Sequence, residues 1–179
     1  HRDVLFSREL YIEREDFMEN APPKYFRMTP GADVRLKHAY ILHCTGVKKD
    51  NDGNILKITA TYYPDSKSGE DVSGIKPKGT LHWVSIADAA PCEIRLYDRL
   101  FTVPDPTADQ NVDFLSFYNP KSLELVSDAR MESSLLSAKS GMQFQFLRQG
   151  YFCVDKSSTS DRIVSVSYTH LRAHETVLD

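Results

Sequence analysis

The chain has 179 residues and a formal net charge of −3 at pH 7. A chain of this length buries roughly 70% of its extended surface on folding, so it can form a substantial hydrophobic core. Hydrophobic residues at 41% and charged residues at 26% exclude a collagen-like, mucin-like or disordered protein. The slightly acidic balance also excludes a general basic surface for arbitrary nucleic acid, so any RNA binding has to depend on local contacts.

Neither the ends of the chain nor its cysteines indicate a membrane or secreted protein. No apolar run approaches the roughly 20 residues of a membrane-spanning helix, and the first residues lack the regions of a signal peptide. Cys44, Cys92 and Cys153 form no C-x-x-C pair, so we expect buried, reduced thiols. We therefore expect a cytoplasmic protein without a membrane partner and, since the chain does not begin with Met, a piece of something longer.

Apolar and polar residues alternate along most of the chain, as is typical of β-strands. Residues 50–54 predict a hairpin loop, because Asn, Asp and Gly tolerate positive φ, and residues 65–78 predict a longer polar loop. Helical signals are confined to residues 13–17 and 85–89. The expected strands cover residues 34–37, 39–45, 55–62, 79–84 and 93–97. We therefore predict an all-β fold with short helices, as a barrel or sandwich.

Two later segments bear on the organisation of the chain. Residues 103–107 carry two prolines, which remove hydrogen-bond donors, so we expect a connection between two strand-rich units there. From Val166 onwards the sequence resembles an in-frame translation of a sequencing-library adapter, so we expect residues 166–179 to be a non-native tail that adds nothing to the core. His170 and His174 in this tail have the i, i+4 spacing of helical metal ligands, but no third ligand is near and we expect no metal site.

The motifs of common enzyme active sites are absent from the sequence. There is no G-x-x-x-x-G-K-[ST], no G-x-G-x-x-G after a strand, no H-E-x-x-H and no G-x-S-x-G. His43 and His82 lie within strand patterns, where an imidazole on the surface of a sheet is the more frequent role. We therefore expect no catalytic residue in this chain.

Basic, amide and aromatic residues instead gather near the ends of predicted strands. They occur in the strings at residues 24–27 (Lys-Tyr-Phe-Arg) and 144–148 (Phe-Gln-Phe-Leu-Arg) and as the pair Arg35 and Lys37, which face one side of a strand. Such groups can bond the edges of unstacked RNA bases while the rings stack on them. A solvated strand face gives the same alternation, so this pattern alone favours RNA binding only weakly.

Several longer strings resemble the C-terminal anticodon-binding region of the glutaminyl-tRNA synthetases, which are class I aminoacyl-tRNA synthetases. The most specific are His-Trp-Val-Ser at residues 82–85 and Glu-Ile-Arg-Leu-Tyr-Asp-Arg-Leu-Phe at residues 93–101. Residues 10–17, 30–36 and 150–153 add to them, and the resemblance extends from about Val4 to Val164.

This resemblance implies a fold and a function. The fold would be two β-barrels, a proximal one from residues 1–29 plus 101–165 and a distal one from residues 30–100. The function would be recognition of the anticodon of tRNA(Gln) by a monomer that binds no DNA. The parent would be a glutamine–tRNA ligase whose catalytic half, with its ATP and Mg, lies upstream, so this fragment would hold no cofactor.

The resemblance also assigns base contacts to individual residues. Arg2 and Gln145 would read the middle uracil of the anticodon, and Arg27 would read the guanine at the third position. Arg35 and Lys37 would approach the first, wobble base, whereas Lys24 and Arg148 would support the backbone or nearby bases.

Three departures from the family pattern weaken parts of this assignment. Lys37 stands where the family commonly has Arg, so a point charge replaces bidentate recognition. Phe26 stands where a basic residue is common, and the closing string of the family is replaced by the adapter-like tail.

Two alternatives stay open at this point. The glutamyl-tRNA synthetases share the architecture, and the amino acid attached by the full-length protein would separate the two. A stand-alone RNA-binding β-barrel module is the other alternative, and a Rossmann-type half encoded upstream would exclude it.

Overall fold

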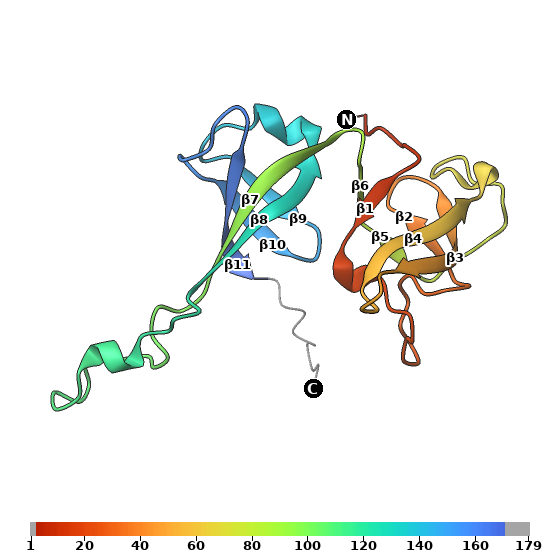
Figure 1. The fold of residues 1–179 in the computed structure, drawn as a ribbon. Coiled ribbons are helices and arrows are strands. Elements are labelled where there is room, and N and C mark those ends of the chain that lie inside the picture. Colours follow the sequence, from red (N-terminus) through yellow and green to blue (C-terminus); the bar gives the residue numbers. More distant parts are fainter. Residues whose placement is uncertain (1–2, 171–179) are drawn as a thin grey trace, which may run out of the picture. The chain divides into compact units, whose positions relative to one another are not determined.

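The computed structural model describes residues 3–170, which form strands and short 3-10 helices (Figure 1). The chain divides into two compact units, here called the N-terminal unit (Asp3–Ala87) and the C-terminal unit (from Asp88). Among the described residues no helix exceeds five residues, so the predicted all-β class is confirmed. No helix in this part of the chain has the length and apolar character needed to cross a membrane.

The N-terminal unit contains a four-stranded sheet in the order β4-β3-β2-β5 and a two-stranded ribbon of β1 and β6. Its elements are β1 (Leu10–Ile12), η1 (Arg14–Asp16), β2 (Asp33–Leu36), β3 (Ile41–Lys49), β4 (Ile55–Tyr62), η2 (Pro64–Ser66), β5 (Thr80–Leu81) and β6 (Trp83–Ser85). The alternation in β2 buries Val34 and Leu36 in the core, which stabilises the unit by about 1.5–3 kcal/mol for each side chain. Cys44, Leu81 and Trp83 pack into the same core.

The C-terminal unit is built on one five-stranded sheet in the order β8-β7-β11-β10-β9. Its elements are β7 (Ala89–Tyr97), η3 (Phe114–Phe117), β8 (Leu123–Glu132), η4 (Ser133–Ser137), β9 (Gln143–Phe146), β10 (Gly150–Val154) and β11 (Ile163–His170). The central strand β11 runs parallel to β7 and antiparallel to β10. Cys92, Met131, Val154 and Ile163 belong to the core of this unit.

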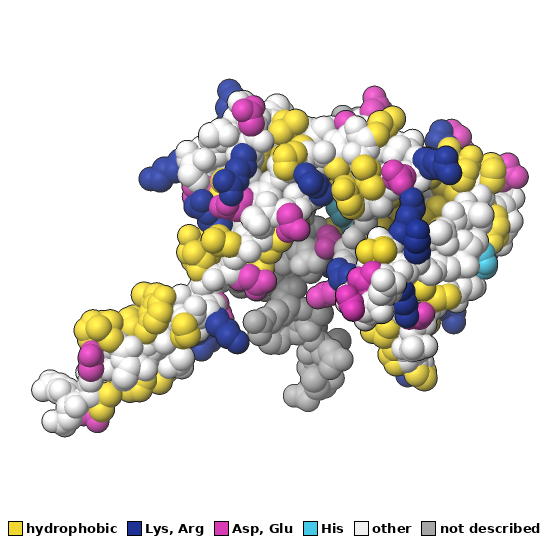
Figure 2. Space-filling view, viewed as in Figure 1, with side chains coloured by type: hydrophobic (Ala, Val, Ile, Leu, Met, Phe, Trp, Pro, Cys, Tyr) yellow, Lys and Arg dark blue, Asp and Glu magenta, His cyan; other side chains and the backbone are white. Residues whose placement is uncertain are grey.

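A long connection between β7 and β8, residues 98–122, projects from this sheet and includes η3 (Figure 1). The bridge between Phe101 and Tyr118 holds its two sides together, and the Asp113 carboxylate caps η3 by accepting a hydrogen bond from the Leu115 amide at 3.0 Å. Hydrophobic side chains lie exposed along this projection (Figure 2), among them Leu115. The prolines of residues 103–107 therefore lie inside one unit and do not join two.

The observed division of the chain differs from the expected one, in which residues 1–29 joined residues 101–165. Strand β1 pairs with β6, so that Tyr11 lies opposite Val84, and Phe17 is buried in the same core as Val34. The first stretch of the chain therefore packs with residues 30–87. The predicted short helix at residues 85–89 is also wrong, because β6 ends at Ser85 and β7 begins at Ala89 with only a turn between them.

The expectation that residues 166–179 add nothing to the core also differs from the structure. Val166 lies opposite Arg95 of β7 and Cys153 of β10, in the middle of the sheet. Ser167 is buried, and its hydroxyl accepts a hydrogen bond from the Tyr97 amide at 3.3 Å. Residues 171–179 lie outside the described part of the chain, and with them His174.

The cysteines differ in burial, which predicts an order of chemical reactivity. Burial raises the pKa of the Cys92 thiol to about 11 and also raises the pKa of Cys44, whereas Cys153 is only half-buried. Since the thiolate is the reactive form, iodoacetamide at pH 8 is expected to label Cys153 first and the other two only after unfolding in urea. Peptide mass spectrometry over time measures this order, and equal labelling of Cys92 and Cys153 in the native protein would contradict it.

Candidate nucleic-acid interface

The loop formed by residues 18–27 carries two of the predicted contacts, Lys24 and Arg27. Its ends are tied together, because the Met18 amide donates to the Met28 carbonyl at 3.1 Å and the Met28 amide donates to the Asp16 carbonyl at 2.9 Å. At the tip, Lys24 adopts a positive φ of 71° and its side chain is exposed. The loop projects from the unit (Figure 1) with a fixed base.

Arg27 is held at the base of this loop by η1. Its Nε lies 3.4 Å from the Asp16 carboxylate, which is 1% exposed, and its Nη1 donates to the Glu15 carbonyl at 3.1 Å. The Tyr25 hydroxyl donates to the same carbonyl at 2.9 Å, so both side chains point toward η1. The Arg27 side chain is 38% exposed. A guanidinium has five N–H donors in a fixed plane, so an oriented Arg27 can still present a pair of them to a base.

Arg35 occupies a different environment from the one that its predicted role requires. Its Nη1 donates to the Ser66 carbonyl at 2.8 Å and to the Ala39 carbonyl at 3.3 Å, and its Nη2 forms an ion pair with Asp71. Hydrogen bonds from Ser73, and more weakly the contact with Arg35, hold the pKa of Asp71 below its usual range. Arg35 thus ties β2 to the loop after η2, and reading the wobble base would require it to exchange Asp71 for RNA.

Lys37 follows the end of β2, and its backbone is firmly placed. Its amide donates to the Leu81 carbonyl at 2.8 Å, and its carbonyl accepts from Trp83 Nε1 at 3.0 Å. The Trp83 of the His-Trp-Val-Ser string therefore serves to position the backbone of Lys37 while its ring fills the core.

Gln145 and Arg148 lie on the β9–β10 hairpin of the C-terminal unit. Gln145 is exposed opposite Tyr151, while the neighbouring Phe146 stacks on the buried Phe152 with 4.4 Å between ring centroids. Arg148 lies in the turn with a positive φ of 65°. The alternation of the Phe-Gln-Phe string thus exposes the glutamine and turns its flanking rings to the other face of the strand.

Two aromatic neighbours and one lysine near these residues were missed by sequence reasoning. Tyr151 lies opposite Gln145, and the ring of Tyr168 lies 6.1 Å from that of Tyr151. Lys78 lies beside Phe26, with its Nζ 5.3 Å from the ring centroid. No local signal could have found these pairs, since each joins different strands or loops. Arg2, the remaining predicted contact, lies outside the described residues.

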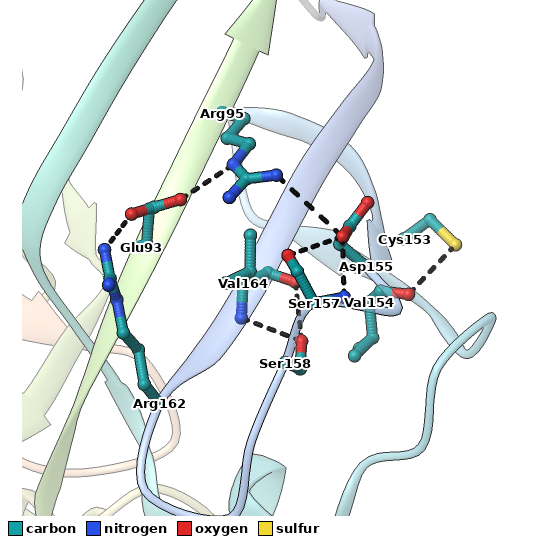
Figure 3. Close-up of polar contacts among 9 residues, drawn as sticks. All are labelled: Glu93, Arg95, Cys153, Val154, Asp155, Ser157, Ser158, Arg162 and Val164. Carbon is teal, nitrogen blue, oxygen red and sulfur yellow. Dashed lines mark hydrogen bonds and ion pairs between the residues drawn. The ribbon is translucent and has the colours of Figure 1, made fainter.

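The Glu-Ile-Arg string, in contrast, contributes to the stability of the C-terminal unit (Figure 3). The buried Glu93 accepts a hydrogen bond from Arg95 Nε at 2.7 Å and forms a second ion pair with Arg162. Arg95 also reaches Asp155, 3.8 Å away, whose pKa is lowered mainly by hydrogen bonds from Ser157. These ion pairs join β7 to the two ends of the connection between β10 and β11, residues 155–162, and the charges are satisfied among themselves.

Within residues 3–170, no group of three or more His, Cys, Asp or Glu side chains is arranged to hold a metal ion. The exposed polar and aromatic groups described above can form hydrogen bonds and stacking contacts with bases. They contain no nucleophile paired with a general base.

Comparison with known proteins identifies the class to which this chain belongs. Two family models, both described as "tRNA synthetases class I (E and Q), anti-codon binding domain", match residues 1–63 and 80–155. The chain belongs to this family of anticodon-binding domains. The predicted resemblance to the anticodon-binding region of the glutaminyl-tRNA synthetases is thereby confirmed.

Individual proteins similar to this chain narrow the comparison to glutamine–tRNA ligases. The chain is 47% identical over 163 residues to a glutamine–tRNA ligase of Bradyrhizobium diazoefficiens, covering 91% of this chain and 29% of the relative. It is 48% identical over 163 residues to that of Proteus mirabilis, again covering 91% and 29%. The corresponding ligase of Rhodopirellula baltica is 48% identical over 164 residues, covering 91% and 27%. The chain thus spans less than a third of the length of these relatives.

Proposed function

We propose that this chain is the anticodon-binding part of a glutamine–tRNA ligase and that it recognises the anticodon of tRNA(Gln). An upstream catalytic part, with ATP and Mg, would attach glutamine to the tRNA. The identity of 47–48% to glutamine–tRNA ligases over most of this chain supports glutamine rather than glutamate as the amino acid. We also propose that the protein is monomeric and cytoplasmic and that it binds neither DNA nor a membrane.

The two compact units provide a structural counterpart for the two barrels of the proposal. The sheet of the N-terminal unit, together with its β1–β6 ribbon, would form one anticodon-binding barrel, and the five-stranded sheet of the C-terminal unit would form the other. The boundary between the two units at residues 87 and 88 supports assigning one barrel to each side of it rather than joining residues 1–29 to residues 101–165.

The observation that carries the proposal is the placement of Arg27. A guanidinium oriented by a buried carboxylate and a backbone carbonyl, yet 38% exposed, is preorganised for a base edge. Guanine presents its O6 and N7 acceptors at the spacing of two guanidinium donors. We therefore assign the third anticodon base, a guanine, to Arg27.

The middle and first bases are assigned with different degrees of structural support. Gln145, exposed beside Tyr151, has an amide that can bond uracil while the tyrosine ring lies next to it. Arg2 is assigned to the same base from the family alone. Arg35 and Lys37 are assigned to the wobble base, on the condition that Arg35 exchanges Asp71 for RNA. Lys24 and Arg148 are assigned to the RNA backbone or nearby bases.

Replacing Arg27 by lysine tests this assignment. Arg27→Lys keeps a positive charge beside Asp16 but removes the planar pair of donors. Its affinity for an anticodon stem-loop with guanine at the third position is expected to fall by roughly 1–3 kcal/mol, or about 5- to 150-fold. Fluorescence anisotropy with stem-loops that carry each of the four bases at that position measures the preference.

Arg8→Gln provides the matched control, because Arg8 is an exposed arginine of the same unit that has no assigned role. This variant should keep the guanine preference. An Arg27→Lys protein with an unchanged melting temperature and an unchanged guanine preference would remove Arg27 from the site.

A further inference from the structure

Phe26 is a half-exposed aromatic residue at the base of the 18–27 loop, with a lysine beside its ring. Its side chain is 50% exposed, and Lys78 Nζ lies 5.3 Å from the centroid of the ring. Tyr25 and Arg27, on either side of it in sequence, both reach the Glu15 carbonyl on η1 instead. Phe26 and Lys78 therefore form a second feature of this loop, separate from the guanidinium of Arg27.

The position of Phe26 is set by close backbone contact with Gly79. A Cβ atom built on Gly79 would lie 1.9 Å from the Phe26 carbonyl oxygen, so only glycine permits the two chains to approach this closely. Gly79 is in turn fixed to the sheet, because its carbonyl accepts a hydrogen bond from the Arg35 amide at 3.0 Å. Phe26 and Lys78 are thus held next to each other before any ligand binds.

Charge around the ring favours an anionic, planar ligand. Lys24 and Lys76 are exposed and lie two residues from Phe26 and Lys78, respectively, in sequence. An exposed aromatic face beside lysines is the arrangement by which proteins bind single-stranded nucleic acid, with the ring stacking on a base and the ammonium neutralising a phosphate. Lys78 Nζ lies over one face of the ring, where cation–π attraction keeps its charge close to the platform, so a base would stack on the opposite face.

We propose that Phe26 and Lys78 form a stacking platform for one unpaired base of the bound RNA. This inference rests on the proposed anticodon recognition, and it adds a base other than the one that Arg27 reads. Because every base has a flat face, the platform contributes affinity without base preference. Phe26 thereby supplies, by stacking, a contact at the position where the family pattern commonly has a basic residue.

The test uses the full chain and a set of anticodon stem-loops at 50 mM salt. Phe26→Leu should weaken binding about tenfold, to the same extent for each base at the third anticodon position. Phe26→Tyr, which keeps the ring, should retain wild-type affinity. Phe114→Leu is the matched control, since Phe114 is 45% exposed in the C-terminal unit and should tolerate the change without loss of binding. Lys78→Gln should make the plot of log affinity against log salt concentration less steep, by the amount expected for the loss of about one phosphate contact.

A direct readout of stacking comes from 5-iodouridine placed in turn at each loop position. Irradiation should crosslink Phe26 in the wild-type and Phe26→Tyr proteins from one position, and mass spectrometry identifies the crosslinked peptide. Unchanged affinity of a folded Phe26→Leu protein, with the guanine preference of the wild type intact, would overturn the platform and leave the proposed function standing. A wild-type chain that fails to bind any stem-loop would overturn both.

Discussion

A chain that ends at Ser165 is expected to have a strongly destabilised C-terminal unit. The truncation removes the second half of β11, which lies between β7 and β10 in the middle of the five-stranded sheet. Several ladder hydrogen bonds of about 1 kcal/mol each disappear, so the loss should be roughly 3–5 kcal/mol. Small domains have only about 5–15 kcal/mol of stability in total, so this loss should lower the urea midpoint of the C-terminal unit markedly.

A second truncation, ending at His170, keeps all of β11 and provides the reference for this measurement. Urea unfolding followed by circular dichroism gives the midpoint for each protein, and Trp83 fluorescence reports separately on the N-terminal unit, which should be unaffected. Equal midpoints for the two truncations would mean that residues 166–170 do not contribute to folding.

The local elements of the fold could be predicted wherever a pattern repeats within a few residues. Alternation along β2 identifies Val34 and Leu36 as buried, and the Phe-Gln-Phe string exposes Gln145 between buried or half-buried rings. Periodicity says nothing of which strands pair, however. The parallel pairing of β11 with β7 and the pairing of β1 with β6 join residues far apart in the chain, so the division into units could not be derived from sequence.

For the candidate site too, the sequence indicates individual residues but not the contacts between distant parts of the chain. The sequence singles out Arg27 as part of a basic and aromatic string near a strand end, but the orientation of its side chain depends on the buried Asp16 of η1. The engagement of Arg35 by Asp71 and the ring contact of Phe26 with Lys78 both depend on the course of the long loop at residues 65–78. A polar loop of this length carries no pattern that predicts its path, so these contacts could only be found in the structure.

Gly79→Ala is expected to destabilise the N-terminal unit and to weaken RNA binding together. The added methyl group would lie 1.9 Å from the Phe26 carbonyl oxygen and 2.8 Å from the carbonyl carbon, and both atoms belong to the backbone. A flexible side chain could move aside, but here one of the two segments must shift, and overpacking of this severity costs about 3 kcal/mol or more. The shift would separate Phe26 from Lys78 and disturb the hydrogen bond from Arg35 to the Gly79 carbonyl.

Gly46→Ala is the control for the loss of a glycine from the same unit. A Cβ there would meet only the Thr59 hydroxyl at 3.5 Å, an ordinary contact, so its melting temperature should stay close to that of the wild type. Thermal unfolding and anisotropy with the anticodon stem-loop measure both effects. A Gly79→Ala protein as stable as Gly46→Ala would show that residues 26 and 79 do not lie in contact, and the preorganised position of Phe26 would lose its structural basis.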